Sequence, residues 1–523
     1  MATYIFGIGG TGARVLRSLT MLLASGVEGT STNNEIIPVI IDYDGDNGDT
    51  KLTQDILENY QRINRMCYGT RTHDEHFFCS PVTKLREKVG PERVANFHAG
   101  TRFNIFLEDM DETTTFSSHI GYHQLNDASQ TSPTRHLLDS LYNTSDSEVS
   151  KNGVIKDNPD AELHMKLYHG FRGCPSLGCV VTRQLTHSNE LAQIETVINA
   201  NDRIIIVGSI FGGTGASGIP TLVDHFKNGP AAATFQNCPI GVLAVMPYFK
   251  VADDIESPIN SKSFIAKAKA ALDTYDDTVR QYVNALYLVG DANTAVAFDN
   301  NEGGDAQRNE AHIVELVGAM MLIDFMNKPT AAIGHGEVFE FGMRRNPIPP
   351  EVIGYNDFFK EETCIPYIDP MARFMLFKTF CQKYFIPGRS QANDIWLLRT
   401  DLAQKKDLKN ELTKFFKTFE KWIIELEGKK RPLKLFNVNE SDYLKLYDYM
   451  NLEATNFFNS DAFKEDDIRK ALSDANGDVT KGQREMTNQH KFEDKPEELF
   501  MVNSNIAMRE IFEKKITPFI NKN

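Results

Sequence analysis

Apolar runs alternate with helix-periodic stretches along the N-terminal part of the chain. Runs that are rich in β-branched residues predict buried strands. These strands are expected at 3–8, 36–42, 203–210, 240–249 and 285–291. Helices are expected between them, at 15–23, from 179 up to about 200, and at 219–226. Because parallel strands need long crossover connections, this alternation predicts an α/β fold with a doubly wound, mostly parallel sheet.

The pattern changes after the fifth predicted strand. Residues 309–327 are apolar on nearly every face, which is typical of a buried central helix. Prolines interrupt the chain from 330 to 370, and helical periodicity then returns, including the charged run 401–427. No clear series of strands is visible after 345. Residues 50–165 are polar and irregular, which predicts an inserted, partly helical segment with loops.

Charge and composition narrow the classes of ligand and location. The chain has 56 Lys and Arg against 71 Asp and Glu, a net charge of −15, so nucleic acid is not expected as the main ligand. Seven cysteines include no CxxC pair, which argues against a disulfide framework or a structural zinc site. No apolar stretch reaches the roughly 18–20 residues that cross a bilayer, and the start MATYIFGIGG lacks a basic signal region. We therefore expect a cytoplasmic protein without direct membrane insertion.

Two glycine clusters each follow a predicted strand and precede a predicted helix. Residues 7–12 fit the pattern GxGxxG, and residues 212–218 read GGTGASG. Glycine lets backbone N–H groups approach a phosphate closely, and a helix N-terminus favours an anion. One such loop is common in α/β folds. Two in one chain predict that a polyphosphate is held from two sides.

A run of acidic residues follows the second predicted strand. Its members are Asp42, Asp44, Asp46 and Asp49. The carboxyl ends of the strands form the ligand-binding edge of an open α/β sheet. We therefore expect Asp42 and Asp44 at the ligand site.

Several segments, taken in order, resemble the nucleotide loops of the tubulin and FtsZ superfamily. GGTGASG resembles its signature loop, GGGTGSG or GGGTGTG, with Phe211 in place of the first glycine. FGIGGTGA is similar to the first phosphate loop, and VIIDYDGDN to the segment that ends in NTD. GFRGCPSLG resembles the third loop, GxGxxPxxG, and VMPYFK resembles the loop written PF. The resemblance covers 1–50 and 165–327, and it is closest to divergent prokaryotic tubulin-like proteins.

This resemblance implies GTP or GDP as the ligand, with Mg²⁺, and no separate metal site in the protein. In the first turn of the central helix, Asn309 or His312 would read guanine, whose N1–H and amine are both donors. Alternatively, His312 is a buried histidine whose hydrogen-bond partner is a backbone group. The implied nucleotide-binding residues are Gly9, Gly10, Thr11, Gly12, Asp42, Asp44, Gly170, Arg172, Gly173, Gly212, Gly213, Thr214, Gly215, Ala216, Ser217, Gly218, Pro247, Asn309 and His312.

The resemblance also implies an order of domains. Residues 1–305 would form the nucleotide-binding GTPase domain, with the insertion at about 50–165. Residues 306–328 would be the central helix and 329–400 a second domain. Residues 401–523 would form a helical C-terminal region. The insertion and the C-terminal helices are the candidate surfaces for a protein partner.

In polymerising members of the superfamily, acidic residues after the central helix enter the next subunit's site and orient the attacking water. The segment IGYNDFFKE offers Asp357 and Glu361 for this role. An ordinary turn with solvated charges is the alternative reading. The resemblance thus implies a GTPase whose site is completed by self-association into filaments or oligomers, in a cytoskeletal or membrane-associated system.

Two other functions remain open. One is a GTP-dependent switch or scaffold that does not polymerise. The other is a Rossmann-type NAD or FAD enzyme, in which Gly7, Gly9 and Gly12 hold the pyrophosphate and Asp42 the ribose. The dinucleotide-enzyme hypothesis assigns no role to the second and third glycine segments. His73 and His76 have HxxH spacing but no partner cluster, so we expect no metal there.

Overall fold

The fold is described from a computed structural model of the chain. The residues that it describes are 1–27, 35–69, 76–90, 103–105, 111, 113–125, 133–142, 162–168, 170–252, 263–291, 297–298, 304–340, 352–387, 405–428, 431–437, 446–447 and 496–517.

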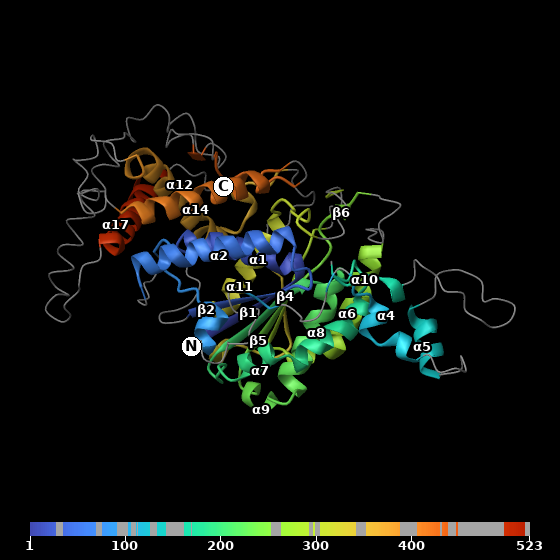
Figure 1. Cartoon of the computed structure of the whole chain (residues 1–523). Coiled ribbons are helices and arrows are strands. Elements are labelled where there is room, and N and C mark those ends of the chain that lie inside the picture. Colours follow the sequence, from blue (N-terminus) through green and yellow to red (C-terminus); the bar gives the residue numbers. More distant parts are fainter. Residues whose placement is uncertain are drawn as a thin grey trace.

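A parallel β-sheet forms the centre of the described structure (Figure 1). Its seven strands follow the spatial order β3-β2-β1-β4-β5-β7-β9, and every pairing is parallel. In this order the strands are β3 (Asn104–Ile105), β2 (Glu35–Ile41), β1 (Ala2–Ile8), β4 (Arg203–Ser209), β5 (Ile240–Val245), β7 (Ala285–Val289) and β9 (Glu337–Glu340). A second, two-stranded sheet pairs β6 (Lys250–Val251) with β8 (Ala297–Phe298).

Helices cover both faces of this sheet, which confirms the predicted doubly wound α/β fold (Figure 1). The helices on one face are α1 (Gly9–Ala24), α2 (Gly48–Cys67) and the central helix α11 (Ile313–Asn327). Those on the other face include α6 (Pro175–Thr182), α7 (Asn189–Glu195), α8 (Gly213–Asn228), α9 (Ala232–Phe235) and α10 (Phe264–Thr278). Strands β1 and β4 are buried along their whole length, as parallel strands between two helical layers must be.

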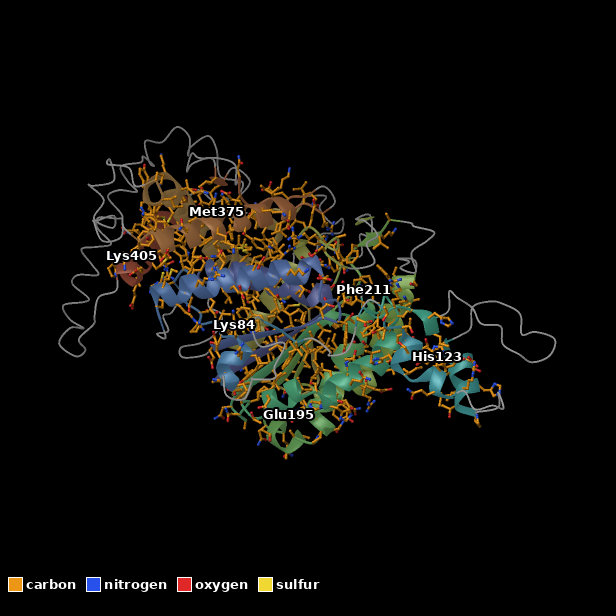
Figure 2. All side chains as sticks on the ribbon, in the orientation of Figure 1. Lys84, His123, Glu195, Phe211, Met375 and Lys405 are labelled. Carbon is orange, nitrogen blue, oxygen red and sulfur yellow. The ribbon has the colours of Figure 1, made fainter. Side chains whose placement is uncertain are left out.

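A further helical layer lies outside α1 and α2, as predicted for the C-terminal part of the chain (Figure 1). It contains α12 (Asp369–Phe380), α14 (Lys406–Leu426) and α17 (Pro496–Ile511). Figure 2 shows Met375 within this layer. Phe374 of α12 and Phe415 of α14 make ring contacts with Phe78, so these helices share one hydrophobic core with the sheet domain.

The predicted insertion begins with regular structure. Helix α2 spans twenty residues and packs against α1, so it is the crossover helix that follows β2. The later part of the segment contains α4 (Phe116–His119) and α5 (Pro133–Tyr142). Together with Leu163 and Phe171, Phe116 belongs to a separate small core beside the main one. The insertion therefore packs against the segment that contains the third glycine motif.

Element boundaries differ from the predictions for local reasons. Helices α1 and α8 begin inside the glycine clusters, at Gly9 and Gly213, rather than after them. The central helix begins at Ile313, because His312 caps it: the Nδ1 of His312 accepts from the Val314 N–H at 3.2 Å. In the described part of the chain, no helix has the length and apolarity needed to cross a bilayer.

Candidate functional site

An open cavity lies at the carboxyl ends of β1 and β4. The connection after β1 runs to β2 on one side, and the connection after β4 runs to β5 on the other, so this is a topological switch point of the sheet. With the solvent-filled space at its mouth, the cavity has a volume of about 970 Å³.

Most of the predicted nucleotide-binding residues line this cavity. They are Gly9, Gly10, Thr11, Asp42, Asp44, Gly170, Arg172, Gly173, Gly212, Gly213, Thr214, Gly215 and Asn309. The sequence prediction did not include several other lining residues. These are Arg14, Asn47, Phe171, Ser209, Phe211, Phe249, Val251, Phe264 and Gln307.

The first glycine cluster turns the chain from β1 into α1. Gly9 has φ +66°, a left-handed conformation that a side chain would strain. Gly12 does not line the cavity. A Cβ on Gly12 would lie 2.6 Å from the carbonyl carbon of Gly7 and 2.8 Å from the oxygen of Val207, so this glycine lets α1 pack closely on the strands. No described side chain caps the N-terminus of α1, and its first turn holds no acidic residue.

The second glycine cluster repeats this arrangement after β4. Gly212 precedes α8, whose N-terminus is also uncapped by any described side chain and free of acidic residues in its first turn. Of the predicted residues, Ala216, Ser217 and Gly218 lie deeper in α8 and do not line the cavity. The Ser217 hydroxyl donates to the Gly213 carbonyl at 2.9 Å, which makes its role structural.

The third glycine segment closes the cavity from the side of the insertion. Gly170 and Gly173 have φ values of +78° and +77°, and Arg172 between them has φ +42°. The Lys267 ammonium of α10 donates to the Gly173 carbonyl at 2.5 Å. This unusual backbone places a cationic residue in the cavity wall.

Two buried carboxyl groups lie at the end of β2. Asp42 is 4% exposed and Asp44 is 2% exposed. Burial, and after it the charge of Asp44, raise the pKa of Asp42 to about 7. Its oxygens accept from the Asp44 N–H at 3.2 Å and from the Thr50 hydroxyl at 3.1 Å. Paired carboxylates are ligands of the kind that hard divalent cations prefer.

A buried ion network lies under the cavity beside Asn309. The Arg14 guanidinium donates from Nη1 to Asp49 at 2.8 Å, and from Nε to Glu315 at 2.6 Å. The Tyr248 hydroxyl donates to Glu315 at 2.7 Å. The three charged side chains are at most 3% exposed, so each needs its charged partners to offset the free-energy cost of burying its own charge. This network fixes the start of α1 relative to α2 and α11.

Aromatic side chains form the apolar wall of the cavity. Phe211, which stands in place of a signature-loop glycine, makes ring contacts with Phe249 and Phe264 at 5.5 and 5.0 Å. In Figure 2 it lies between the α1 and α2 layer and the helices of the opposite face. The sequence analysis singled out Phe211 and the segment VMPYFK for their resemblance to nucleotide loops, but it did not predict an aromatic wall.

Two further predicted residues, His312 and Pro247, do not line the cavity. His312 caps α11, its Nε2 is buried and has no hydrogen-bond partner among the described residues, and burial lowers its pKa. Pro247 accepts a hydrogen bond from the Asp291 N–H through its carbonyl. Of the two residues proposed to read guanine, only Asn309 reaches the cavity.

The predicted catalytic acids do not line the cavity of their own chain. Asp357 accepts from the Gly354 N–H at 2.7 Å, within a short turn, and Glu361 is exposed. Their predicted role lies in the site of a neighbouring copy, so it stays a prediction. Among the described residues, no group of three His, Cys, Asp or Glu side chains could hold a metal ion. His73 lies outside the described residues.

No family model matches the chain, and no curated protein matches it. Among solved structures, the chain is similar to CetZ2 from Haloferax volcanii, in a GTPγS-bound protofilament. The similarity covers 62% of this chain, with 13% sequence identity and a TM-score of 0.27. The chain spans 59% of the length of that protein.

Proposed function

We propose that the cavity binds GTP or GDP and that the chain is a GTPase of the tubulin and FtsZ type. The observation that carries the proposal is the pair of helices α1 and α8, whose N-termini are capped by no described side chain and meet at one cavity from adjacent strands. The first N–H groups of a helix have no partner within it, and the helix dipole favours an anion there. Two such ends suit a chain of phosphates better than a single anionic group.

The phosphates lie along the glycine segments in this proposal. Gly10 and Gly213 line the cavity at the two helix N-termini. Arg172 supplies positive charge from the third segment. Such fixed donors and cations stabilise the charge that spreads over the transferred phosphoryl group.

Asp42 and Asp44 fit a site for Mg²⁺. Both carboxyl groups line the cavity; burial, and after it the charge of Asp44, raise the pKa of Asp42, and a bound cation would favour its ionised form. A bound Mg²⁺ supplies positive charge against the phosphate oxygens. Ionisation of Asp42 supplies the negative charge that a cation binds, so the affinity of this site for Mg²⁺ is higher above neutral pH.

Asp357 and Glu361 complete the proposal, as acids that serve the site of a neighbouring copy. Hydrolysis is then slow in the isolated chain and rises on self-association into filaments or oligomers. A non-polymerising switch or scaffold would bind GTP in the same cavity without this rise.

A dinucleotide enzyme is the second candidate, because Asp42 stands at the end of β2 where a ribose-binding acid is expected. In this alternative, Gly7, Gly9 and Gly12 hold the pyrophosphate of NAD or FAD. It leaves the uncapped N-terminus of α8 without a role.

The test is equilibrium binding of GTP, GDP and NAD to the full chain with Mg²⁺, comparing the wild type with Gly10→Val. A Cβ on Gly10 meets no atom closer than 3.6 Å, so the larger side chain extends into the cavity while the fold is retained. We expect GTP binding by the wild type and at least a tenfold loss in Gly10→Val, with an unchanged melting temperature. NAD binding without GTP binding would support the dinucleotide enzyme instead.

A further inference from the structure

Two side-chain amides line the cavity near its ion network, and neighbouring groups fix the orientation of each. They belong to Asn309 and Gln307, in the segment that leads into the central helix α11. An amide has a donor end and an acceptor end, so its orientation decides which base edge it can bind. The groups that set these orientations lie at the N-terminus of α2.

Asp49 holds the donor end of Asn309. One oxygen of Asp49 accepts from the backbone N–H of Asn309 at 3.1 Å, and the other from its Nδ2 at 3.2 Å. Asp49 is fully buried beside the Arg14 guanidinium, and an ionised carboxylate can only accept. The amide nitrogen of Asn309 must therefore face Asp49. Its Oδ1 accepts no hydrogen bond from any described residue, which leaves it for a ligand.

Asn47 holds the acceptor end of Gln307. The Oδ1 of Asn47 caps α2 by accepting from the N–H groups of Asp49 and Thr50, at 3.0 and 3.1 Å. Its Nδ2 is thereby directed to the Oε1 of Gln307, at 2.7 Å. The Nε2 of Gln307 makes no hydrogen bond to another described residue. Gln307 thus offers a donor where Asn309 offers an acceptor.

We infer that Asp49 and Asn47 are positioning residues that make the cavity selective for guanine, an inference that rests on the proposed nucleotide binding. In this arrangement the Oδ1 of Asn309 accepts from N1–H and the amine of guanine, and the Nε2 of Gln307 donates to O6. Adenine presents an acceptor at N1 and a donor at position 6, so both pairs are mismatched. A site that hydrogen-bonds a substrate strongly rejects an analogue that leaves its polar groups unpaired.

The experiment measures the ratio of GTP to ATP affinity by competition, in the full chain with Mg²⁺. Asp49→Asn lets the amide of Asn309 turn, because an asparagine at position 49 can also donate. We expect the wild type to prefer GTP and ITP over ATP, and Asp49→Asn to lower the GTP to ATP ratio by about tenfold or more. Gln307→Glu replaces the donor by an acceptor and lowers the same ratio.

Two control variants separate orientation from stability. Glu315→Gln alters the same Arg14 network without touching Asn309, so it can weaken binding of both nucleotides but keeps their ratio. Arg308→Gln changes an exposed residue next to Gln307 and also keeps the ratio. If Asp49→Asn does not fold, Asn309→Ala, which preserves the Arg14–Asp49 pair, must show the same loss of selectivity.

The outcomes distinguish this inference from the proposed function. Equal affinity of the wild type for GTP and ATP, or an unchanged ratio in folded Asp49→Asn, would overturn the inference while nucleotide binding stands. Absence of any nucleotide binding by the wild type would overturn the proposed function, and the inference with it.

Discussion

Asp42 shows how a single buried group couples the site to pH. Its pKa is raised to about 7, first by burial and then by Asp44. Between the ordinary pKa of an aspartate, roughly 3.9, and this value, the native chain holds a proton that the unfolded chain has lost. The free energy of unfolding therefore falls as the pH rises through that window.

Asp42→Asn should remove this pH dependence in the protein without nucleotide or Mg²⁺. The variant is neutral at every pH, so its gain in stability over the wild type should be larger at pH 8 than at pH 5. The difference should be about 2–3 kcal/mol. Urea unfolding at both pH values measures it. An equal gain at the two pH values would show that Asp42 does not titrate in this range.

Gly12 tests the close approach of α1 to the sheet. Gly12→Ala should lower the free energy of unfolding by about 2–3 kcal/mol, because its Cβ would overlap the backbone of Gly7 and Val207. Gly10→Ala serves as the control, since a Cβ there makes only ordinary contacts. Chemical denaturation of the two variants compares them, and equal stabilities would contradict the packing role of Gly12.

At the scale of elements, α14 binds the sheet domain through one face. Trp422 is 1% exposed, and its indole N–H donates to the Ser18 hydroxyl of α1 at 3.3 Å. Asn59 of α2 donates to Glu411 of the same helix at 2.6 Å. Helix α14 is thus fastened to α1, whose N-terminus lies at the cavity, and to α2.

Trp422→Ala should destabilise the whole chain by about 3–5 kcal/mol, because a large buried side chain is lost between α14 and α1. Ile424→Ala is the matched control on the same helix. Its side chain is 46% exposed, so the change should cost less than about 0.5 kcal/mol. Thermal or urea unfolding would contradict this arrangement if the two variants were equally stable.

The elements of the sheet domain were largely predictable, because their signals are local. Strands β1 and β4 are continuous apolar runs, and glycines mark the helix starts that follow them. Strand β9 was missed because it has only four residues on an exposed edge, with a glutamate at each end. Helix α2 was missed because its polar outer face concealed its packing on α1.

The candidate site was predictable from the sequence only at the glycine loops, where backbone groups form it. Glycine spacing indicated the loops, but Arg14 and Asn47 acquire their roles from partners far along the chain. Arg14 pairs with Glu315 across 301 positions, and Asn47 with Gln307 across 260. No local pattern encodes such pairs. His312 was proposed as a reader from its position, yet its ring serves as a helix cap.

For the whole molecule, the proposed hydrolytic site needs residues from two copies of the chain. Asp357→Ala should leave GTP binding unchanged and lower phosphate release at least tenfold, because Asp357 would act in the neighbouring site. Asp357→Asn keeps a side-chain oxygen that can accept from the Gly354 N–H. A loss of phosphate release in this variant would therefore come from catalysis and not from a disrupted turn. Glu362→Gln alters an exposed neighbouring acid and should change neither quantity. Loss of GTP binding in Asp357→Ala would contradict the proposed role.

Completion of the site between copies is tested by the rate of phosphate release from GTP with Mg²⁺, measured per chain over a range of protein concentrations. A site completed between copies predicts a specific rate that is close to zero in dilute solution and rises above a threshold concentration. A rate per chain that is the same at every concentration would contradict completion of the site by self-association.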